Sequence, residues 1–171
     1  NNLRGDLPAK LGVDYAALAD VNRAIVCVHL SAYGREGSRA AWPGYDYLMQ
    51  AEAGHMSLTG EPGRPPVRAG LSVGDYIPGL YAAFAIVTAL RERDRTGQGQ
   101  YIDVAMLDSA ISLMSQTVGP WLNGRVPQKR RANLSITFEP PADVYPTADG
   151  AMQLAVMRDD HVRQLMELIG H

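Results

Sequence analysis

The chain has 171 residues, which is enough for one domain with a sizeable core, or for one domain and part of another. Apolar residues make up 46% and charged residues 20% of it, and the net charge of −2 gives no electrostatic basis for binding nucleic acid or an anionic membrane. The longest apolar stretch, Leu80 to Leu90, ends at charged residues and falls short of the ~20 residues that span a bilayer.

The first half of the chain predicts two short helices and a strand. Asp14 is a suitable N-cap for a helix from Tyr15 to about Val21. Ala24 to Ser31 is short and rich in β-branched residues, which is typical of a buried strand. Residues 33–38 are expected to form a loop, and Pro43 suits the first turn of a second helix, roughly Tyr45 to Ala53.

Prolines and glycines make residues 60–70 irregular, and the longest helix is expected after them, from about Tyr76 to Arg93. Pro78 would then lie in its first turn, where no backbone hydrogen bond is lost. Gln100 to Ala105 alternates like a strand, and Asp108 opens a helix that should end at about Val118, before Gly119-Pro120.

After a basic, proline-containing stretch, two strands are expected around the Asp149-Gly150 turn, from Ala142 to Pro146 and from Met152 to Met157. A last helix should cover about Asp159 to Ile169. Strands separated by helices indicate an α/β protein.

Cys27 is the single cysteine and lies in the expected buried strand, so a structural thiol and a reducing, cytoplasmic setting are expected. His29 in the same strand is expected to be a hydrogen-bonded core residue. The sequence begins at Asn1 without methionine and stops where a helix would be ending, so we expect both ends to be cuts through a longer protein.

Five segments in this order resemble one family. They are Asn2-Leu3-Arg4-Gly5 with Leu11-Gly12; Pro43-Gly44-Tyr45-Asp46 with Gln50 and Gly54; Val73-Gly74-Asp75 with Gly79 and Ala82-Ala83; Arg91 to Met106; and Tyr145 to Gly150. Each segment alone is a weak signal, but their joint order and spacing are similar to those of the class III, or CaiB/BaiF-type, CoA-transferases. That family also includes the α-methylacyl-CoA racemases.

The resemblance implies a domain organisation. The family's large domain is Rossmann-like, and a smaller α/β domain is inserted into it through linkers. Residues 1–124 would be the middle of the large domain, 125–141 a linker and 142–171 the start of the small domain. The family's subunits interlock as homodimers, so an interlocked homodimer is expected for the full-length protein.

The resemblance also implies a reaction. A CoA thioester would be the substrate, with no permanently bound cofactor and no metal, and a carboxylic acid would be the acceptor. Asp75 matches the family nucleophile, a carboxylate that carries first the acyl group and then CoA. At the mouth of a helix, backbone N–H groups would face the negative charge that develops during attack. The alternative is that Asp75 simply caps a helix that begins at Tyr76.

Four further residues match family contacts to CoA: Asn2, Leu3, Lys10 and Met106. Leu3 replaces an aromatic residue of the family, and Lys10 would supply a point charge to a phosphate group. Lys10 as a solvated lysine and Met106 as a core residue are the open alternatives.

Tyr45, also expected at the CoA site, separates the two chemistries of the family. The racemases have a histidine here that forms an acid–base pair with the aspartate. A tyrosine side chain is a poor base at neutral pH, so the sequence favours the transferase. A racemase that uses another base, such as His55, stays open, as does a catalytically silent CoA-binding or scaffold subunit.

Residues 132–142 contain no glycine, whereas the formate and oxalate branch of the family has a glycine-rich loop near this junction. The resemblance therefore favours a different carboxylic acid. Lys129-Arg130-Arg131 is expected to be a solvated linker segment rather than a nucleic-acid patch.

Overall fold

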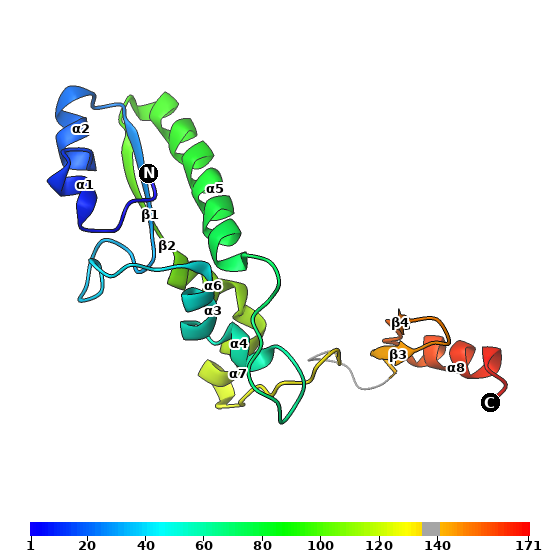
Figure 1. The fold of residues 1–171 in the computed structure, drawn as a ribbon. Helices are drawn as coiled ribbons and strands as arrows, with labels where there is room; N and C mark the ends of the chain where they lie inside the picture. Colours follow the sequence, from blue (N-terminus) through cyan, green and yellow to red (C-terminus); the bar gives the residue numbers. More distant parts are fainter. Residues whose placement is uncertain (135–140) are drawn as a thin grey trace. The chain divides into compact units, whose positions relative to one another are not determined.

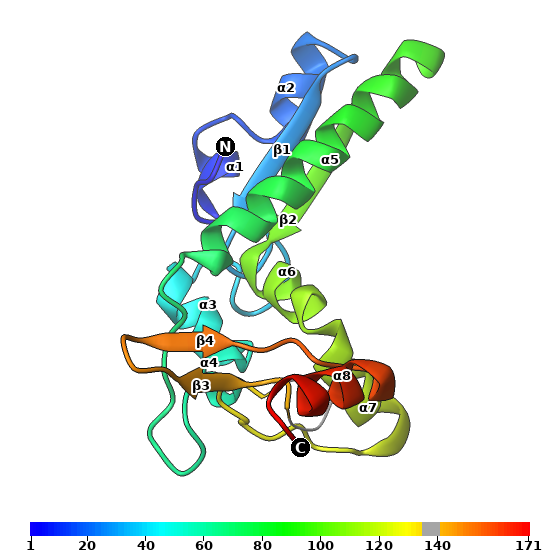
Figure 2. The ribbon, with the colours of Figure 1, turned by 90° about the vertical axis from the view of Figure 1, so that its right-hand side faces the viewer.

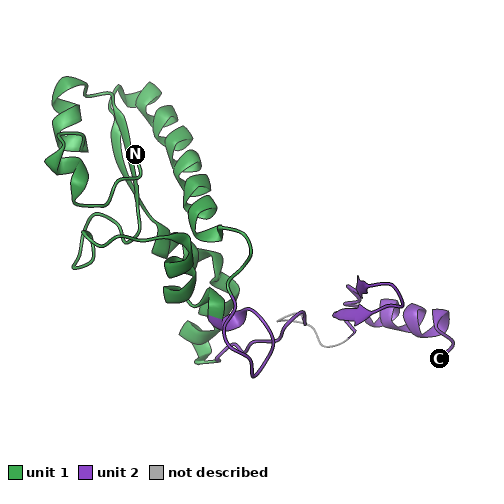
Figure 3. Ribbon diagram, in the orientation of Figure 1, with its two compact units in different colours: residues 1–56, 68–126 green, residues 57–67, 127–171 purple. Residues whose placement is uncertain are grey.

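The computed structural model describes residues 1–134 and 141–171. The chain divides into two compact units (Figure 3): residues 1–56 with 68–126, and residues 57–67 with 127–171. Part of the expected linker, 135–140, lies outside the described residues. The division into the middle of a large domain, a linker and the start of a small domain remains a prediction.

The first unit is built on a parallel pair of strands. Strand β1 (Val26–Ser31) and strand β2 (Gln100–Ala105) pair from Val26 opposite Gln100 to Ser31 opposite Ala105. Helix α5 (Val73–Thr96) contacts both strands and runs along them in Figures 1 and 2, and helices α1 (Leu7–Lys10) and α2 (Tyr15–Val21) precede β1. The expected α/β class is confirmed, as is the cap of α2, where Asp14 accepts a hydrogen bond of 3.3 Å from the Ala17 N–H.

Backbone contacts fix the edge of this strand pair. Asn1 donates to the Val28 carbonyl at 2.8 Å and accepts from the Leu30 N–H at 2.9 Å, so the first residue continues the sheet beyond β1. At the start of β2 the Gly99 N–H donates to the Arg23 carbonyl at 2.8 Å, and a β-carbon on Gly99 would overlap the Ile25 carbonyl.

His29 is fully buried, and both of its ring nitrogens have partners. The Asn1 amide nitrogen can only donate, so it donates to Nδ1 at 2.9 Å, which leaves the proton on Nε2, 3.2 Å from the Cys27 sulfur. The prediction of a hydrogen-bonded core histidine is confirmed, and burial lowers the pKa of His29 and raises that of the Cys27 thiol.

Helix α5 is longer at both ends than the sequence indicates. It begins at Val73, so Pro78 is its sixth residue and not part of its first turn, and the hydrogen bond that an N–H there would make to the Gly74 carbonyl is lost. By length and composition alone α5 could cross a membrane, which corrects the expectation that no stretch is long enough. One such helix is weak evidence, because core helices of water-soluble proteins meet the same criteria.

The helix expected from Asp108 to Val118 is two helices in the structure. Helix α6 (Met106–Leu113) ends at Leu113, Met114 separates the two helices, and α7 (Ser115–Gly124) continues through Gly119 and Pro120. The expected stop at Gly119-Pro120 is wrong. Pro120 leaves the Gln116 carbonyl without its N–H partner, but Gln116 is exposed, so water can hydrate that carbonyl.

Helix α3 (Asp46–Glu52) and the short helix α4 (His55–Leu58) lie between the strands in sequence. Met49 of α3 packs with Ala32 and Met106 in the core cluster of the unit, with Leu30 and Leu107 against it. This core lies where β1 and β2 end.

The second unit contains a small hairpin and one helix. Strands β3 (Val144–Pro146) and β4 (Ala151–Gln153) pair antiparallel around the expected Asp149-Gly150 turn, and both are shorter than predicted. Helix α8 (Asp159–Leu168) follows. Within this unit Arg130 donates to the carbonyls of Ser57, Glu61 and Arg64, so it is part of the structure rather than a solvated linker residue.

Candidate active site

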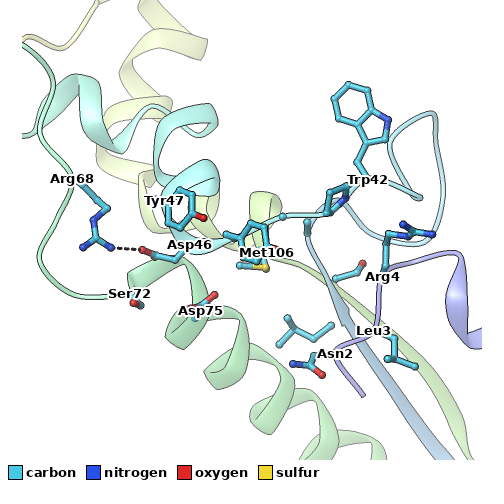
Figure 4. A pocket seen from close by; sticks show the side chains of 16 residues that line it. Asn2, Leu3, Arg4, Trp42, Asp46, Tyr47, Arg68, Ser72, Asp75 and Met106 are labelled. Atoms are coloured by element: carbon cyan, nitrogen blue, oxygen red, sulfur yellow. Dashed lines mark hydrogen bonds and ion pairs between the residues drawn. The ribbon is translucent and has the colours of Figure 1, made fainter.

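A cavity of about 800 Å³ lies at the carboxyl ends of β1 and β2, where open α/β sheets commonly bind ligands. Its walls come from residues 2–4, 30–32 and 42–47, together with Arg68, Ser72, Asp75 and Met106 (Figure 4). Five segments distant in sequence thus meet at one place, and two carboxylates, Asp46 and Asp75, are among the lining residues.

Asp75 is the exposed carboxylate of the two. It is the third residue of α5, whose N-cap is Ser72, so the alternative reading of Asp75 as the N-cap of a helix beginning at Tyr76 is wrong. Among the described residues its side chain has no hydrogen-bond partner. The helix dipole favours a negative charge at this end of α5, and the side chain is open to an electrophile.

Asp46 is the buried carboxylate, with only 5% of its surface exposed. Its Oδ1 accepts from the Gly74 N–H at 2.8 Å, and its two oxygens accept from the Gln50 amide at 3.0 and 2.9 Å. Arg68 donates to Oδ2 at 3.3 Å. A β-carbon on Gly74 would lie 3.0 Å from Oδ1, so a larger residue here would press against Asp46. Asp46 therefore fixes the first turn of α5, which carries Asp75.

The roles of Asp46 and Gln50 do not follow from the signature segment in which both residues lie. A usable signal was present, because the two lie four residues apart and side chains at that spacing share one face of a helix. Gln50 is 1% exposed, and it also accepts from the Ala69 N–H at 2.9 Å and donates to the Leu71 carbonyl at 3.2 Å. It ties the segment before α5 to α3.

The expectation that N–H groups at the start of α5 face the reaction is wrong. The N–H groups of Val73, Asp75 and Tyr76 donate to backbone carbonyls of Leu71 and Ser72, and the Gly74 N–H donates to Asp46. All four N–H groups are already bonded. The start of α5 can therefore stabilise negative charge in the cavity through the helix dipole, but not through free N–H donors.

Of the residues expected to contact CoA, the structure brings Asn2, Leu3, Tyr45 and Met106 together around the cavity with Asp75. Met106 is also a core residue, 6% exposed. Lys10 does not line the cavity. Its Nζ pairs with Asp6 at 2.6 Å, and Arg4 pairs with the same carboxylate at 2.6 Å. The Arg4 guanidinium, followed by the Lys10 ammonium, holds the pKa of Asp6 well below its usual range.

Tyr45 lies immediately before α3, with its ring stacked on that of Tyr47 at a centroid distance of 5.7 Å. His55 points elsewhere: its Nε2 lies 2.9 Å from the Ala110 carbonyl, and it does not line the cavity. The hypothesis that His55 replaces the base of a racemase therefore has no support in the geometry.

The sequence is similar to curated proteins over nearly its whole length. It is 39% identical over 171 residues to the succinate–glutarate CoA-transferase of Agrobacterium fabrum, covering 99% of this chain and 42% of that protein. It is 32% identical over 171 residues to the acetyl-CoA:oxalate CoA-transferase of Acetobacter aceti, covering 99% of this chain and 43% of the relative. The chain thus spans less than half the length of the curated relatives it matches.

A solved structure is similar as well. A CaiB/BaiF family protein from Brucella suis superposes with a TM-score of 0.87 at 32% sequence identity, over 99% of this chain and 44% of that one. The sequence model of CoA-transferase family III matches residues 1–171. The chain therefore belongs to CoA-transferase family III.

Proposed function

We propose that the protein transfers CoA from an acyl-CoA thioester to a carboxylic acid, with the Asp75 carboxylate as the carrier. The observation that carries the proposal is the division of roles between two carboxylates in one cavity. Asp46 is buried and engaged by hydrogen bonds, whereas Asp75 is exposed at the start of α5 and faces the cavity. A carrier must be free to form a covalent bond, so Asp75 is suited to this role and Asp46 is not.

The proposed reaction proceeds by four attacks on carbonyl carbons. An Asp75 oxygen attacks the donor thioester, the C–S bond breaks, and CoA leaves as a thiolate from a mixed anhydride. The thiolate attacks the aspartyl carbonyl, which releases the donor acid and forms an aspartyl-CoA thioester. The acceptor carboxylate then displaces the thiolate, and the thiolate finally attacks the acceptor carbonyl of the second anhydride. Asp75 is regenerated and no net proton transfer is required.

We further propose a dicarboxylic acid as the acceptor. The two relatives are named for succinate and glutarate and for oxalate, which all carry two carboxylates. The cavity of about 800 Å³ also leaves room for a CoA pantetheine arm beside a short acid. We retain the interlocked homodimer as part of the proposal for the full-length protein.

The test is Asp75→Ala in the full-length protein. We expect transfer from succinyl-CoA to glutarate to fall at least ~1,000-fold, because removing a covalent carrier removes the pathway. Hydroxylamine added during turnover should convert Asp75 of the wild-type protein to the hydroxamate, which mass spectrometry of peptides locates. The matched control is Asp108→Ala, because Asp108 also lies in the first turn of a helix but does not line the cavity. Transfer that survives in the Asp75 variant would disprove the carrier role.

A further inference from the structure

Arg68 is the feature of the cavity that the proposed reaction leaves unexplained. It lies in the irregular segment before α5, and it lines the same cavity as Asp75. Figure 4 shows its guanidinium directed toward Asp46, with Ser72 just before α5 and Asp75 in its first turn. Its side chain is 45% exposed, so ligands can reach it.

The single hydrogen bond that Arg68 makes among the described residues is long. Its Nη1 lies 3.3 Å from Asp46 Oδ2, beyond the ~2.7–2.9 Å of a strong charge-assisted bond. Asp46 depends little on this contact, because the Gly74 N–H and the Gln50 amide already serve both of its oxygens at 3.0 Å or less. Most of the Arg68 fork is therefore available to a second carboxylate.

Arg4, the other arginine of the cavity wall, differs in this respect. It binds Asp6 through two nitrogens, Nε at 2.6 Å and Nη2 at 3.1 Å, which is the bidentate arrangement that fills a guanidinium fork. The two arginines thus differ in how much of their donor capacity is already used, and Arg68 has more of it left for an anionic ligand.

The segment that carries Arg68 is held in register with the nucleophile. The Gln50 side chain binds the backbone on both sides of Gly70: it accepts from the Ala69 N–H and donates to the Leu71 carbonyl. Asp46 contacts both the Arg68 guanidinium and the Gly74 N–H. A ligand group on Arg68 would therefore have a fixed position relative to the first turn of α5.

We propose that Arg68 binds the carboxylate of the acceptor that does not react, and so selects dicarboxylic acids over monocarboxylic acids. The inference rests on the proposed function, since it assigns the recognition of the acceptor in that reaction. One carboxylate of the acid attacks the aspartyl-CoA thioester while the guanidinium holds the other by a bidentate pair.

The experiment compares two five-carbon acceptors, glutarate and pentanoate, with saturating succinyl-CoA and the full-length protein. For Arg68→Gln we expect kcat/KM for glutarate to fall about 10- to 100-fold, and kcat/KM for pentanoate to change less than about threefold. Arg68→Lys keeps the charge but not the planar fork. Its kcat/KM for glutarate should therefore lie between those of the wild type and Arg68→Gln. Arg95→Gln is the control, because Arg95 pairs with Glu92 at the far end of α5.

The ratio of the two acids is measured in one preparation, so it does not depend on the fraction of a variant that folds. A loss that is equal for both acids would overturn the inference, since it would mean that Arg68 only supports Asp46, and would leave the proposed function intact. A wild-type protein that uses pentanoate as well as glutarate would also overturn it. A wild-type protein that transfers CoA to neither acid would remove the proposed function and the inference together.

Discussion

The buried carboxylate of Asp46 offers a quantitative test of how the start of α5 is held. Replacing it with alanine leaves the buried Gly74 N–H without an acceptor and removes both bonds from Gln50. An orphaned buried donor costs about 1–3 kcal/mol, and hydrogen bonds to a charged group contribute about 1.5–3 kcal/mol each. The half-exposed Arg68 adds little, because water solvates it. Since these contributions overlap, Asp46→Ala should lower the free energy of unfolding by about 3–5 kcal/mol.

Asp46→Asn separates the contribution of the Gly74 N–H bond from that of the Gln50 bonds. The asparagine oxygen can still accept from the Gly74 N–H, but its NH₂ then faces the NH₂ of Gln50. Rotating the Gln50 amide would remove that conflict and lose the bond from the Ala69 N–H. We therefore expect a loss of about 2 kcal/mol, smaller than for alanine. Adding Gln50→Glu restores an amide–carboxylate pair and should recover part of it.

The assay is urea unfolding of the full-length protein followed by circular dichroism and fluorescence. Asp6→Asn is the control, because Asp6 also accepts hydrogen bonds from an arginine but is more exposed than Asp46, and its variant should shift the midpoint much less. A loss below ~1 kcal/mol for Asp46→Ala would refute the claim that this carboxylate holds the first turn of α5.

Four other substitutions test the stability of the first unit. Burial, reinforced by Arg35, keeps the pKa of His29 below its ordinary value of 6.5, so the unfolded chain binds a proton that the folded chain does not. Stability should therefore decrease as the pH falls through ~6.5 toward the folded pKa, and His29→Gln should flatten this slope in unfolding curves between about pH 7.5 and 5.5; an unchanged slope would contradict it. Gly99→Ala should destabilise the fold by about 3 kcal/mol or more, because the added β-carbon would overlap the Ile25 carbonyl. Gly79→Ala should stabilise the fold by about 0.5–1 kcal/mol, because Gly79 lies in a helix with open space around it. Equal melting temperatures of the two variants would contradict both expectations. Ser31→Ala should be neutral or stabilising by up to ~1 kcal/mol, because the buried hydroxyl has no partner among the described residues, and a clear loss in thermal melts would reveal one.

The elements that the sequence predicted well are those whose signals are local. Helix α2 has its cap, Asp14, directly before it, and β2 has the predicted bounds, although its burial does not alternate. The start of α5 could not be predicted in this way. The Gly74 N–H in its first turn donates to Asp46, which lies 28 residues earlier in the chain. The residues near Val73 therefore contain no signal of that partner.

The candidate site shows the same limit. The family resemblance predicts five site residues that do line one cavity: Asn2, Leu3, Tyr45, Asp75 and Met106. Their binding roles stay predictions. Lys10 was expected beside them, yet Asp6 is one helical turn away and pairs with it instead. The spacing of Asp46 and Gln50 predicts a shared helix face, but not their role, because their backbone partners Gly74 and Ala69 lie far along the chain.

The parallel pairing of β1 and β2 also has a consequence for the order of folding. Val26 pairs with Gln100, 74 residues later, so closing this pair costs more chain entropy than forming α5 or α6, whose contacts are local. The cavity needs residues from both sides of that closure, and it exists only once the strands have met. A ligand of the cavity should therefore slow unfolding while leaving the refolding rate nearly unchanged, because the site is absent until late in folding.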